Sequence, residues 1–379
     1  MKYTETIDYL YNHLPMFSRM GSVAFKKDLT NIRILCERLG NPHLQFKSIH
    51  IGGTNGKGSV SHMLAAVFQT AGYKTGLYTS PHLYDFRERI KVNGQMADEN
   101  FVVDFVEKIK PLIEEIEPSF FEITVAMAFE YFAQQKIDIA VVEVGLGGRL
   151  DSTNIITPVL SIITNIGYDH MNMLGNTLEE IAFEKAGIIK QNTPVVIGES
   201  LPETKPVFDK TASARNAAIY YAQDLYFEKK YTAGEHFLDI TYEGDDQTEI
   251  NIKTDLPGIY QVKNVKTVLT ALYVLKQVGW NIPGTAVKEA LGTVKKRTGL
   301  YGRWEIIHNN PTIVLEVAHN PDGIQQMLLH LQNTSYEGLH LIIGMVKDKE
   351  ISTVLELLPR NARYYFTQAH IPRALPASE

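Results

Sequence analysis

The chain has 379 residues, more than one ordinary hydrophobic core accommodates, so two domains are expected. Hydrophobic residues make up 44% of the sequence and charged residues 21%, which is the mix of a soluble globular protein. The formal net charge of −6 argues against non-specific nucleic-acid binding, because a phosphate backbone favours a basic face, but it leaves room for a local basic pocket.

Cys36 is the only cysteine, so no disulfide can form within the chain and a reducing compartment is expected. It lies in a periodic apolar run over residues 29–39, which favours a buried structural thiol over a nucleophile. Residues 1–14 show helical spacing without a continuous apolar core, so they fit neither a signal peptide nor a membrane span. The sequence therefore predicts a cytoplasmic enzyme with no membrane partner.

Short apolar strands then alternate with amphipathic helices. Strands are expected over residues 48–51, 75–79, 137–144 and 159–166, and helices over residues 60–71, 100–117 and 121–135. The runs IDIAVVEV and VLSIITNI are almost uninterrupted, as in strands buried on both faces of a parallel sheet. Thr177 and Glu180 form a capping-box pattern before a helix that carries Lys185. This alternation predicts a doubly wound α/β sheet.

The character of the sequence changes after residue 224. Residues 224–255 are rich in Tyr, Thr, Gly and Asp and indicate antiparallel strands with turns, followed by a helix over residues 262–278. A second α/β unit begins near Lys295, with strands expected over residues 312–317, 339–345 and 364–367 and helices over residues 322–331 and 351–358. Three parallel strands are fewer than an average sheet holds, so this unit is expected to be incomplete.

A glycine-rich loop stands between the first predicted strand and its helix, in the sequence IHIGGTNGKGSV. Glycines allow positive φ and close backbone approach, so successive N–H groups can face an anion. Lys57 adds a full charge and Ser59 a hydroxyl at the start of the helix. The match to the common G-x-x-x-x-G-K-[ST] pattern is imperfect, because Ile51 replaces the first glycine and Gly58 separates Lys57 from Ser59. A structural turn is the alternative.

This loop, GTNGKGS, resembles that of the Mur ligase superfamily, and especially its folate branch, folylpolyglutamate synthase/dihydrofolate synthase. The resemblance continues in order along the chain through residues 78–82 (YTSPH), 88–90 (ERI), 142–149 (VEVGLGGR), 169–170 (DH), 184–187 (EKAG), 318–321 (AHNP) and 344–349 (GMVKDK). It implies an ATP-dependent ligase with a P-loop-type, mostly parallel sheet domain over residues 1–295. A smaller, incomplete Rossmann-like domain over residues 296–379 would follow.

The resemblance also assigns residues to the nucleotide. They are Thr54, Asn55, Gly56, Lys57, Gly58 and Ser59 in the loop, with Asn264, Arg303, Glu316 and His319 farther along. Arg303 suits bidentate contact to phosphate. The family commonly has an aspartate at position 316, so the resemblance that assigns a nucleotide contact is weaker at Glu316. Without the resemblance, a structural role and a functional role are equally expected for each of Glu316 and His319.

Two Mg²⁺ ions are implied as well. Glu143 ends a buried strand run, where a carboxylate is costly unless it meets a cation, and the resemblance places the first ion on Glu143 and Ser80. The second ion is placed on His170, although Mg²⁺ rarely takes imidazole and a lone histidine is more often structural. Lys185 matches a family lysine that carries a CO₂-derived carbamate; a solvated lysine or an ion pair with Glu184 is the alternative. Lys57, His170 and carbamylated Lys185 are the expected catalytic residues.

A folate site is implied near the phenylalanines that precede a predicted helix. An aromatic ring can stack on a flat heterocycle, but spacing alone favours packing of Phe120 and Phe121 in the core. The resemblance assigns Thr79, Ser119, Phe121, Leu150, Asp151 and Ser152 to this site. The sequence GRLD over residues 148–151 resembles the version in enzymes that also use dihydropteroate, so both activities are expected.

The predicted reaction adds L-glutamate to a folate, and to dihydropteroate, through an acyl phosphate made with ATP. A ligase of the same superfamily that acts on a cell-wall precursor is the nearest rival, but no uridine-nucleotide domain is recognised ahead of the loop. A nucleotide-binding partner protein without catalytic activity is the second rival. A monomer that binds small-molecule substrates and no nucleic acid is expected.

Overall fold

The structure is a computed structural model that describes residues 1–16, 19, 21, 28–347 and 351–379. Within that part of the chain the largest element is an eight-stranded sheet with the order β4-β3-β2-β5-β1-β6-β7-β8. Its strands are β1 (Lys47–Gly52), β2 (Thr75–Tyr78), β3 (Ile90–Val92), β4 (Gln95–Met96), β5 (Ile139–Glu143), β6 (Leu160–Ile163), β7 (Val195–Ile197) and β8 (Ile219–Tyr221). Only β3 and β4 run antiparallel to their neighbours, so the sheet is mostly parallel, as predicted.

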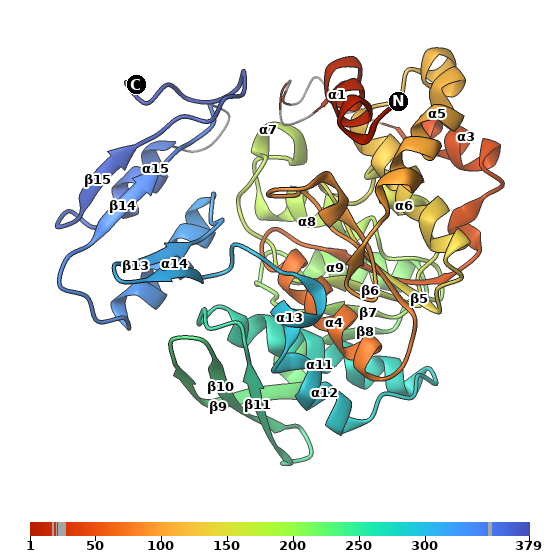
Figure 1. The fold of residues 1–379 in the computed structure, drawn as a ribbon. Coiled ribbons are helices and arrows are strands. Elements are labelled where there is room, and N and C mark those ends of the chain that lie inside the picture. The colour runs from red at the N-terminus through yellow and green to blue at the C-terminus, as the bar shows by residue number, and fades with distance from the viewer. Residues whose placement is uncertain (17–18, 20, 22–27, 348–350) are drawn as a thin grey trace.

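Helices cover both faces of this sheet (Figure 1). On one face lie α4 (Lys57–Thr70), α11 (Gln261–Gln277), α12 (Gly284–Leu291) and α13 (Val294–Thr298). The other face carries α1 (Tyr3–His13), α3 (Thr30–Arg38), α5 (Glu99–Ile116) and α6 (Phe120–Gln134), with α8 (Leu178–Ala186) and α9 (Lys205–Ala214) over β6 and β7. Val141 faces the α4 side and Val142 the α6 side, which explains why β5 reads as an unbroken apolar run. The doubly wound prediction is confirmed.

Local sequence signals set several element boundaries. Thr177 caps α8, its hydroxyl accepting the Glu180 N–H while the Glu180 side chain accepts the Thr177 N–H, so the predicted capping box is confirmed.

Cys36 is fully buried in α3 and burial raises the pKa of its thiol to about 12, which confirms a structural thiol. Short segments complete this region: α7 (Met171–Leu174), α10 (Ala222–Leu225), and the 3-10 turns η2 (Pro42–Leu44), η3 (Phe86–Arg89) and η4 (Ser152–Ile155).

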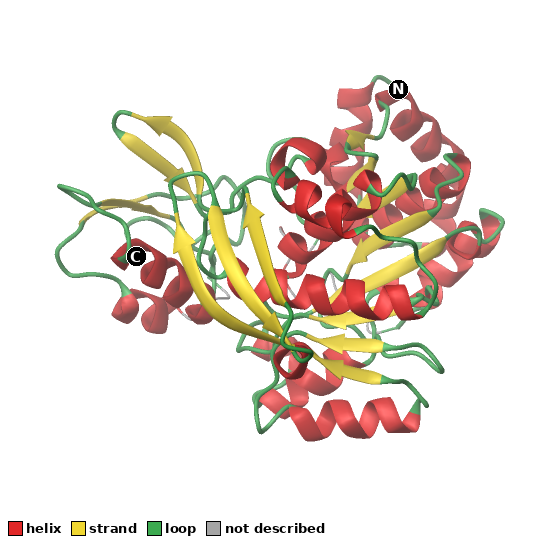
Figure 2. Cartoon of the chain, turned by 90° about the horizontal axis from the view of Figure 1, so that it is seen from below, coloured by secondary structure: helices red, strands yellow, loops and turns green. Residues whose placement is uncertain are grey.

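A separate antiparallel sheet, shown from below in Figure 2, follows in the order β11-β10-β9, as residues 224–255 predicted. Its strands are β9 (Tyr226–Ala233), β10 (Leu238–Gly244) and β11 (Glu249–Thr254). One face of β10 is apolar: Leu238, Ile240 and Tyr242 are buried in the same core as α11 and α12. The Tyr242 hydroxyl donates to the carbonyl of Val262 in α11, so this small sheet is tied to the helix beside the glycine-rich loop.

The C-terminal elements lie together to one side of the large sheet in Figure 1. They are β12 (Glu305–Asn309), β13 (Thr312–Leu315), α14 (Pro321–Gln332), β14 (His340–Ile343), α15 (Ile351–Leu357) and β15 (Arg363–Phe366). β14 and β15 pair in parallel around a small core that includes Ile324 and Val354. The prediction of three parallel strands is wrong for the first of them, because β13 pairs antiparallel with β12. Only two residues join these strands, and so short a connection permits only an antiparallel pair.

No helix in the described ranges is both long and apolar enough to cross a membrane. The domain boundary near residue 295 stays a prediction. What the fold establishes is that the carboxyl ends of β1, β2, β5 and β6 meet at one edge of the sheet, which is where open α/β sheets bind ligands.

Replacing Leu64 of α4 tests how far the fold depends on this helix. Leu64 is fully buried in the core between α4 and the sheet, so Leu64→Ala is expected to lower the free energy of unfolding by about 2–5 kcal/mol. The matched control is Leu44→Ala, because that side chain is 69% exposed and its loss should change stability by less than about 0.5 kcal/mol. Urea unfolding measures both, and equal midpoints would contradict this packing.

Candidate active site

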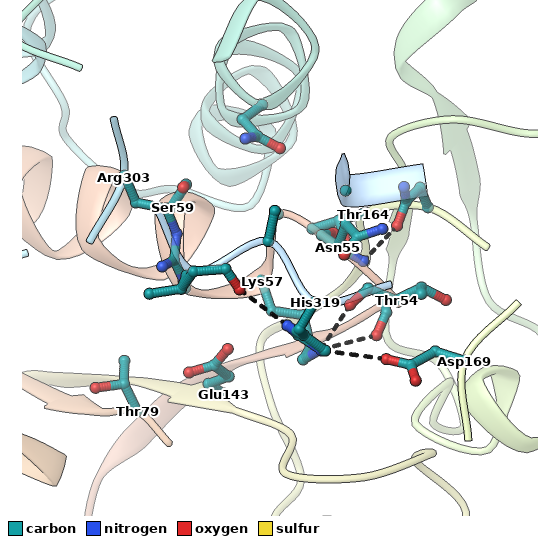
Figure 3. A pocket seen from close by; sticks show the side chains of 18 of the residues that line it. Thr54, Asn55, Lys57, Ser59, Thr79, Glu143, Thr164, Asp169, Arg303 and His319 are labelled. Atoms are coloured by element: carbon teal, nitrogen blue, oxygen red, sulfur yellow. Dashed lines mark hydrogen bonds and ion pairs between the residues drawn. The ribbon is translucent and has the colours of Figure 1, made fainter. Parts of the chain in front are cut away.

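A cavity of about 630 Å³ opens at the carboxyl edge of the large sheet. Its walls come from the loop between β1 and α4, the ends of β2 and β5, the segment after β6, and residues 299–326 of the C-terminal part. The cavity therefore lies between the large sheet and the C-terminal elements. Figure 3 shows Lys57, Glu143, Arg303, Asp169 and His319 around it.

Two glycines allow the loop between β1 and α4 to lie close to Thr164 and to α11. Gly53 has φ +143°, and a Cβ built there would lie 1.9 Å from Thr164 Oγ1, after the end of β6. Gly56 has φ +84° and caps α4; its Cβ would lie 2.3 Å from Asn264 Oδ1 of α11. Any side chain at either position would push the loop away from β6 or α11.

The half-buried Lys57 and the buried Lys185 converge on one main-chain oxygen. Lys57 Nζ donates to the carbonyls of Gly53 and Thr54 at 3.0 Å each, and Lys185 Nζ donates to the same Gly53 carbonyl at 2.8 Å. Burial lowers the pKa of Lys57, an effect that Glu143 and Asp169 oppose. Burial, reinforced by the charge of Lys57, lowers the pKa of Lys185 to about 7. The ion pair of Lys185 with Glu184, which was the alternative to a carbamate, is not formed; Glu184 pairs with Arg149 at 2.9 Å instead.

Glu143 ends β5 with its carboxylate in the cavity and only 5% of its surface exposed. The backbone N–H of Ser80 donates to Glu143 Oε2 at 3.0 Å, so the two predicted metal residues are neighbours. Burial raises the pKa of Glu143, and Lys57 counteracts this only in part. A carboxylate in this setting gains from an additional cation.

His170 also lines the cavity, in the left-handed backbone region at φ +51°. Its Nε2 is 3.8 Å from Asp169 Oδ2. Among the residues that the structure describes, no three His, Cys, Asp or Glu side chains are grouped closely enough to hold a metal by themselves. Mg²⁺ bound with a nucleotide needs only one or two side chains, because phosphates and water complete its coordination. The donor set therefore fits such an ion.

The C-terminal part adds charged groups above the loop. The Arg303 guanidinium lies over the start of α4, 3.2 Å from where a Cβ of Gly58 would be. Glu316 Oε2 accepts from the Tyr260 hydroxyl at 2.6 Å and from the Trp304 N–H at 3.0 Å. His319 Nε2 lies 3.3 Å from Asp169 Oδ2 (Figure 3). The carboxylates of Glu316 and Asp169 therefore already contact donor groups of the protein.

All the predicted nucleotide, metal and catalytic residues line this cavity, but the predicted folate residues divide. Thr79 lines it, whereas Ser119, Phe121, Leu150, Asp151 and Ser152 do not. Phe121 packs behind the wall, where a Cβ on Gly145 would lie 2.4 Å from its ring. Asp151 Oδ2 accepts the Leu146 N–H at 2.8 Å, and Ser119 caps α6. Phe121 and Asp151 thus support the 145–147 segment.

Sequence reasoning gave no individual role to Asp169, which lines the cavity, or to Asn320 and Gln261, which contact residues of its wall. Asp169 and Asn320 belong to motifs that were recognised, yet neither received a role. Gln261, whose Nε2 donates to Ser59 Oγ at 3.2 Å, had no signal in the sequence. In the motif over residues 344–349, Asp348 and Lys349 lie outside the described residues.

The chain matches two family models, the Mur ligase middle domain over residues 51–272 and the Mur ligase glutamate ligase domain over residues 302–379. It is 35% identical to the dihydrofolate synthase/folylpolyglutamate synthase of Bacillus subtilis, covering 93% of this chain and 84% of that protein. It is 33% identical to the folylpolyglutamate synthase of Lacticaseibacillus casei, covering 99% and 88%.

Solved structures agree with these sequence matches. An FPGS–AMPPCP–folate complex superposes with a TM-score of 0.87 at 32% identity, covering 97% of this chain and 89% of that one. Escherichia coli FolC in complex with DHPP and ADP superposes with a TM-score of 0.84 at 28% identity, covering 100% and 86%. The chain therefore belongs to the folylpolyglutamate synthase/dihydrofolate synthase family of Mur ligases.

Proposed function

We propose that this chain is an ATP-dependent ligase that joins L-glutamate to the carboxylate of a folate. The observation that carries the proposal is a single cavity in which the glycine loop, Lys57 and the buried Glu143 face Arg303 and His319. Relatives that are named as such ligases, and a related complex with an ATP analogue and folate, support it.

In the proposed reaction the γ-phosphoryl group of ATP passes to the folate carboxylate, which leaves ADP and an acyl phosphate. The α-amino nitrogen of glutamate then attacks the acyl carbon, and phosphate leaves as the amide bond forms. The backbone N–H groups at the start of α4, with Lys57 and Arg303, are placed to hold the phosphates in line. No protein nucleophile is needed, so alignment and charge neutralisation are the contribution of the chain.

Mg²⁺ bound with ATP would neutralise charge on the reacting oxygens. For the first ion we propose Glu143 and Ser80, because they adjoin and the buried carboxylate lacks a full counter-charge. His170 and a carbamylated Lys185 are proposed for the second. Carbamylation requires a neutral amine, and the low pKa of Lys185 provides one near neutral pH. It would also turn one of the two adjacent lysine cations into an anionic oxygen donor.

Use of dihydropteroate is a further part of the proposal. It is supported by the GRLD sequence at residues 148–151 and by the relatives named for both activities. We propose that Phe121, Asp151, Leu150, Ser152, Ser119 and Thr79 shape the pterin pocket behind residues 145–147. ADP release with dihydropteroate and glutamate tests this, and its absence would confine the chain to extending folates. The monomeric state and the cytoplasmic location stay predictions.

ADP release distinguishes the proposed enzyme from its two rivals. The proposed ligase should release ADP only when ATP, a folate and glutamate are all present. Release that depends on a cell-wall precursor instead would identify the superfamily rival. A nucleotide-binding partner protein would show no dependence on any acceptor.

Replacing Lys57 tests the phosphate loop. Lys57→Met removes the ammonium group that contacts the carbonyls of both Gly53 and Thr54, so kcat/KM for ATP should fall by about 100-fold or more. Lys210→Met, at an exposed lysine of α9, is the control and should turn over like the wild type. Steady-state ADP release measures both, and unchanged turnover in Lys57→Met would refute the proposal.

Replacing Gly53 tests the close approach to β6. Gly53→Ala puts a methyl group against Thr164, so the loop must shift and KM for ATP should rise by about 10-fold or more. Gly40→Ala is the matched control, because Gly40 also has a positive φ, +80°, but nothing lies within 4 Å of its Cβ position. Equal ATP affinities in the two variants would show that the contact with Thr164 does not shape the loop.

Carbamylation of Lys185 predicts a dependence on CO₂ and pH. An amine with a pKa of about 7 becomes mostly neutral as the pH rises from 6 to 8, whereas an ordinary lysine stays protonated. Intact mass spectrometry in bicarbonate should therefore show the added mass of one CO₂ more fully at pH 8 than at pH 6. Lys185→Arg should lack it. An unmodified wild-type mass at pH 8 would exclude the carbamate.

A further inference from the structure

The side-chain amide of Asn320 joins the C-terminal part to the phosphate loop. Asn320 Nδ2 donates to Asn55 Oδ1 at 3.0 Å, and Asn55 Nδ2 donates back to Asn320 Oδ1 at 3.2 Å. These two residues lie 265 positions apart in the sequence. A reciprocal pair of this kind fixes both amides in one plane and one orientation.

Asn320 makes every hydrogen bond that an amide can make. Besides the pair with Asn55, its Nδ2 donates to Asp169 Oδ2 at 3.2 Å and its Oδ1 accepts the Gly323 N–H at 2.8 Å. Two donors and two acceptor sites are thus all occupied. The residue is only 2% exposed, so losing any partner would leave a buried polar group unsatisfied.

Asn55 is held on its other side by the segment after β6. Its backbone N–H donates to Asn165 Oδ1 at 2.8 Å, and its carbonyl accepts the Thr164 hydroxyl. The backbone of the loop is therefore fixed by the large sheet, while the Asn55 side chain is fixed from the C-terminal part. The loop follows β1 of the large sheet, and Asn320 fixes it by a contact from outside that sheet.

Asp169 extends the same connection. One carboxylate oxygen, Oδ2, meets both Asn320 and the His319 imidazole, whose Nε2 lies at 3.3 Å (Figure 3). His319 and Asn320 are consecutive residues between β13 and α14, and Asp169 follows β6. Two points of attachment therefore fix how this short segment faces the loop.

We propose that Asn320 is a positioning residue, which holds Asn55 and the phosphate loop in the shape that binds triphosphate when the C-terminal part is in place. This rests on the proposed function, because the loop must first be the nucleotide site. Binding of nucleotide and seating of the C-terminal part would then favour each other, since each fixes the same loop.

A simpler role for Asn320 is that it caps α14, since its Oδ1 accepts the Gly323 N–H. A serine separates the two roles. Asn320→Ser keeps a capping hydroxyl but is too short to bridge to Asn55, whereas Asn320→Ala loses both contacts. Asn333→Ser, at the exposed other end of α14, is the matched control.

Titration calorimetry with AMPPCP and Mg²⁺ on the full chain tests the proposal. Asn320→Ser and Asn320→Ala are both expected to bind AMPPCP about 10-fold more weakly than the wild type, and Asn333→Ser is expected to match it. Affinity that falls only in Asn320→Ala, with Asn320→Ser like the wild type, would show that the residue acts as a cap and would overturn the proposal.

A double-mutant cycle with Asn55→Ala provides the second test, from the loop side. If Asn320 acts through Asn55, adding Asn320→Ser to Asn55→Ala should weaken AMPPCP binding by less than about 2-fold further. Losses that multiply would overturn the positioning role. A wild type that binds AMPPCP without folate-dependent ADP release would overturn the proposed function alone, and a wild type that binds no AMPPCP would overturn both.

Discussion

The Gly53 carbonyl is the point on which the site depends. It accepts from both Lys57 and Lys185, and its residue can adopt the required backbone only because it lacks a Cβ. Burial lowers the pKa of Lys185, and the neighbouring Lys57 ammonium lowers it further because both groups donate to one oxygen. Such a site is stabilised by anionic ligands. A triphosphate, and the proposed carbamate on Lys185, would both supply negative charge.

The same arrangement explains why the buried Glu143 is tolerated. Its pKa is raised by burial, yet Lys57 and the Ser80 N–H both favour the charged carboxylate. The end of β5 therefore offers an oxygen donor at the edge where the phosphates would lie. Positive groups on the loop and a carboxylate across from it are what transfer of a phosphoryl group between two oxygens requires.

Residues behind the wall connect the nucleotide site with the proposed pterin pocket. Phe121 packs against Gly145, and Asp151 accepts the N–H of Leu146, so both define the segment that follows Glu143. A ligand that moved either side chain would also move the wall next to the Glu143 carboxylate. The structure thus gives these residues a supporting contact alongside the binding role that the family implies.

The sequence by itself determined the parallel sheet, the antiparallel insertion, the cap at Thr177 and the position of the loop, because each depends on neighbouring residues and their periodicity. It also pointed to Lys57, Glu143 and Arg303 through motifs that line one cavity in the structure. Only the tertiary structure decided that β13 pairs with β12, and that Asn55, Asp169 and Asn320 meet. The contacts of Asn320 with Asn55 and Asp169 join residues more than a hundred positions apart, and the distance between such residues is set by how the layers pack, which local propensity does not encode.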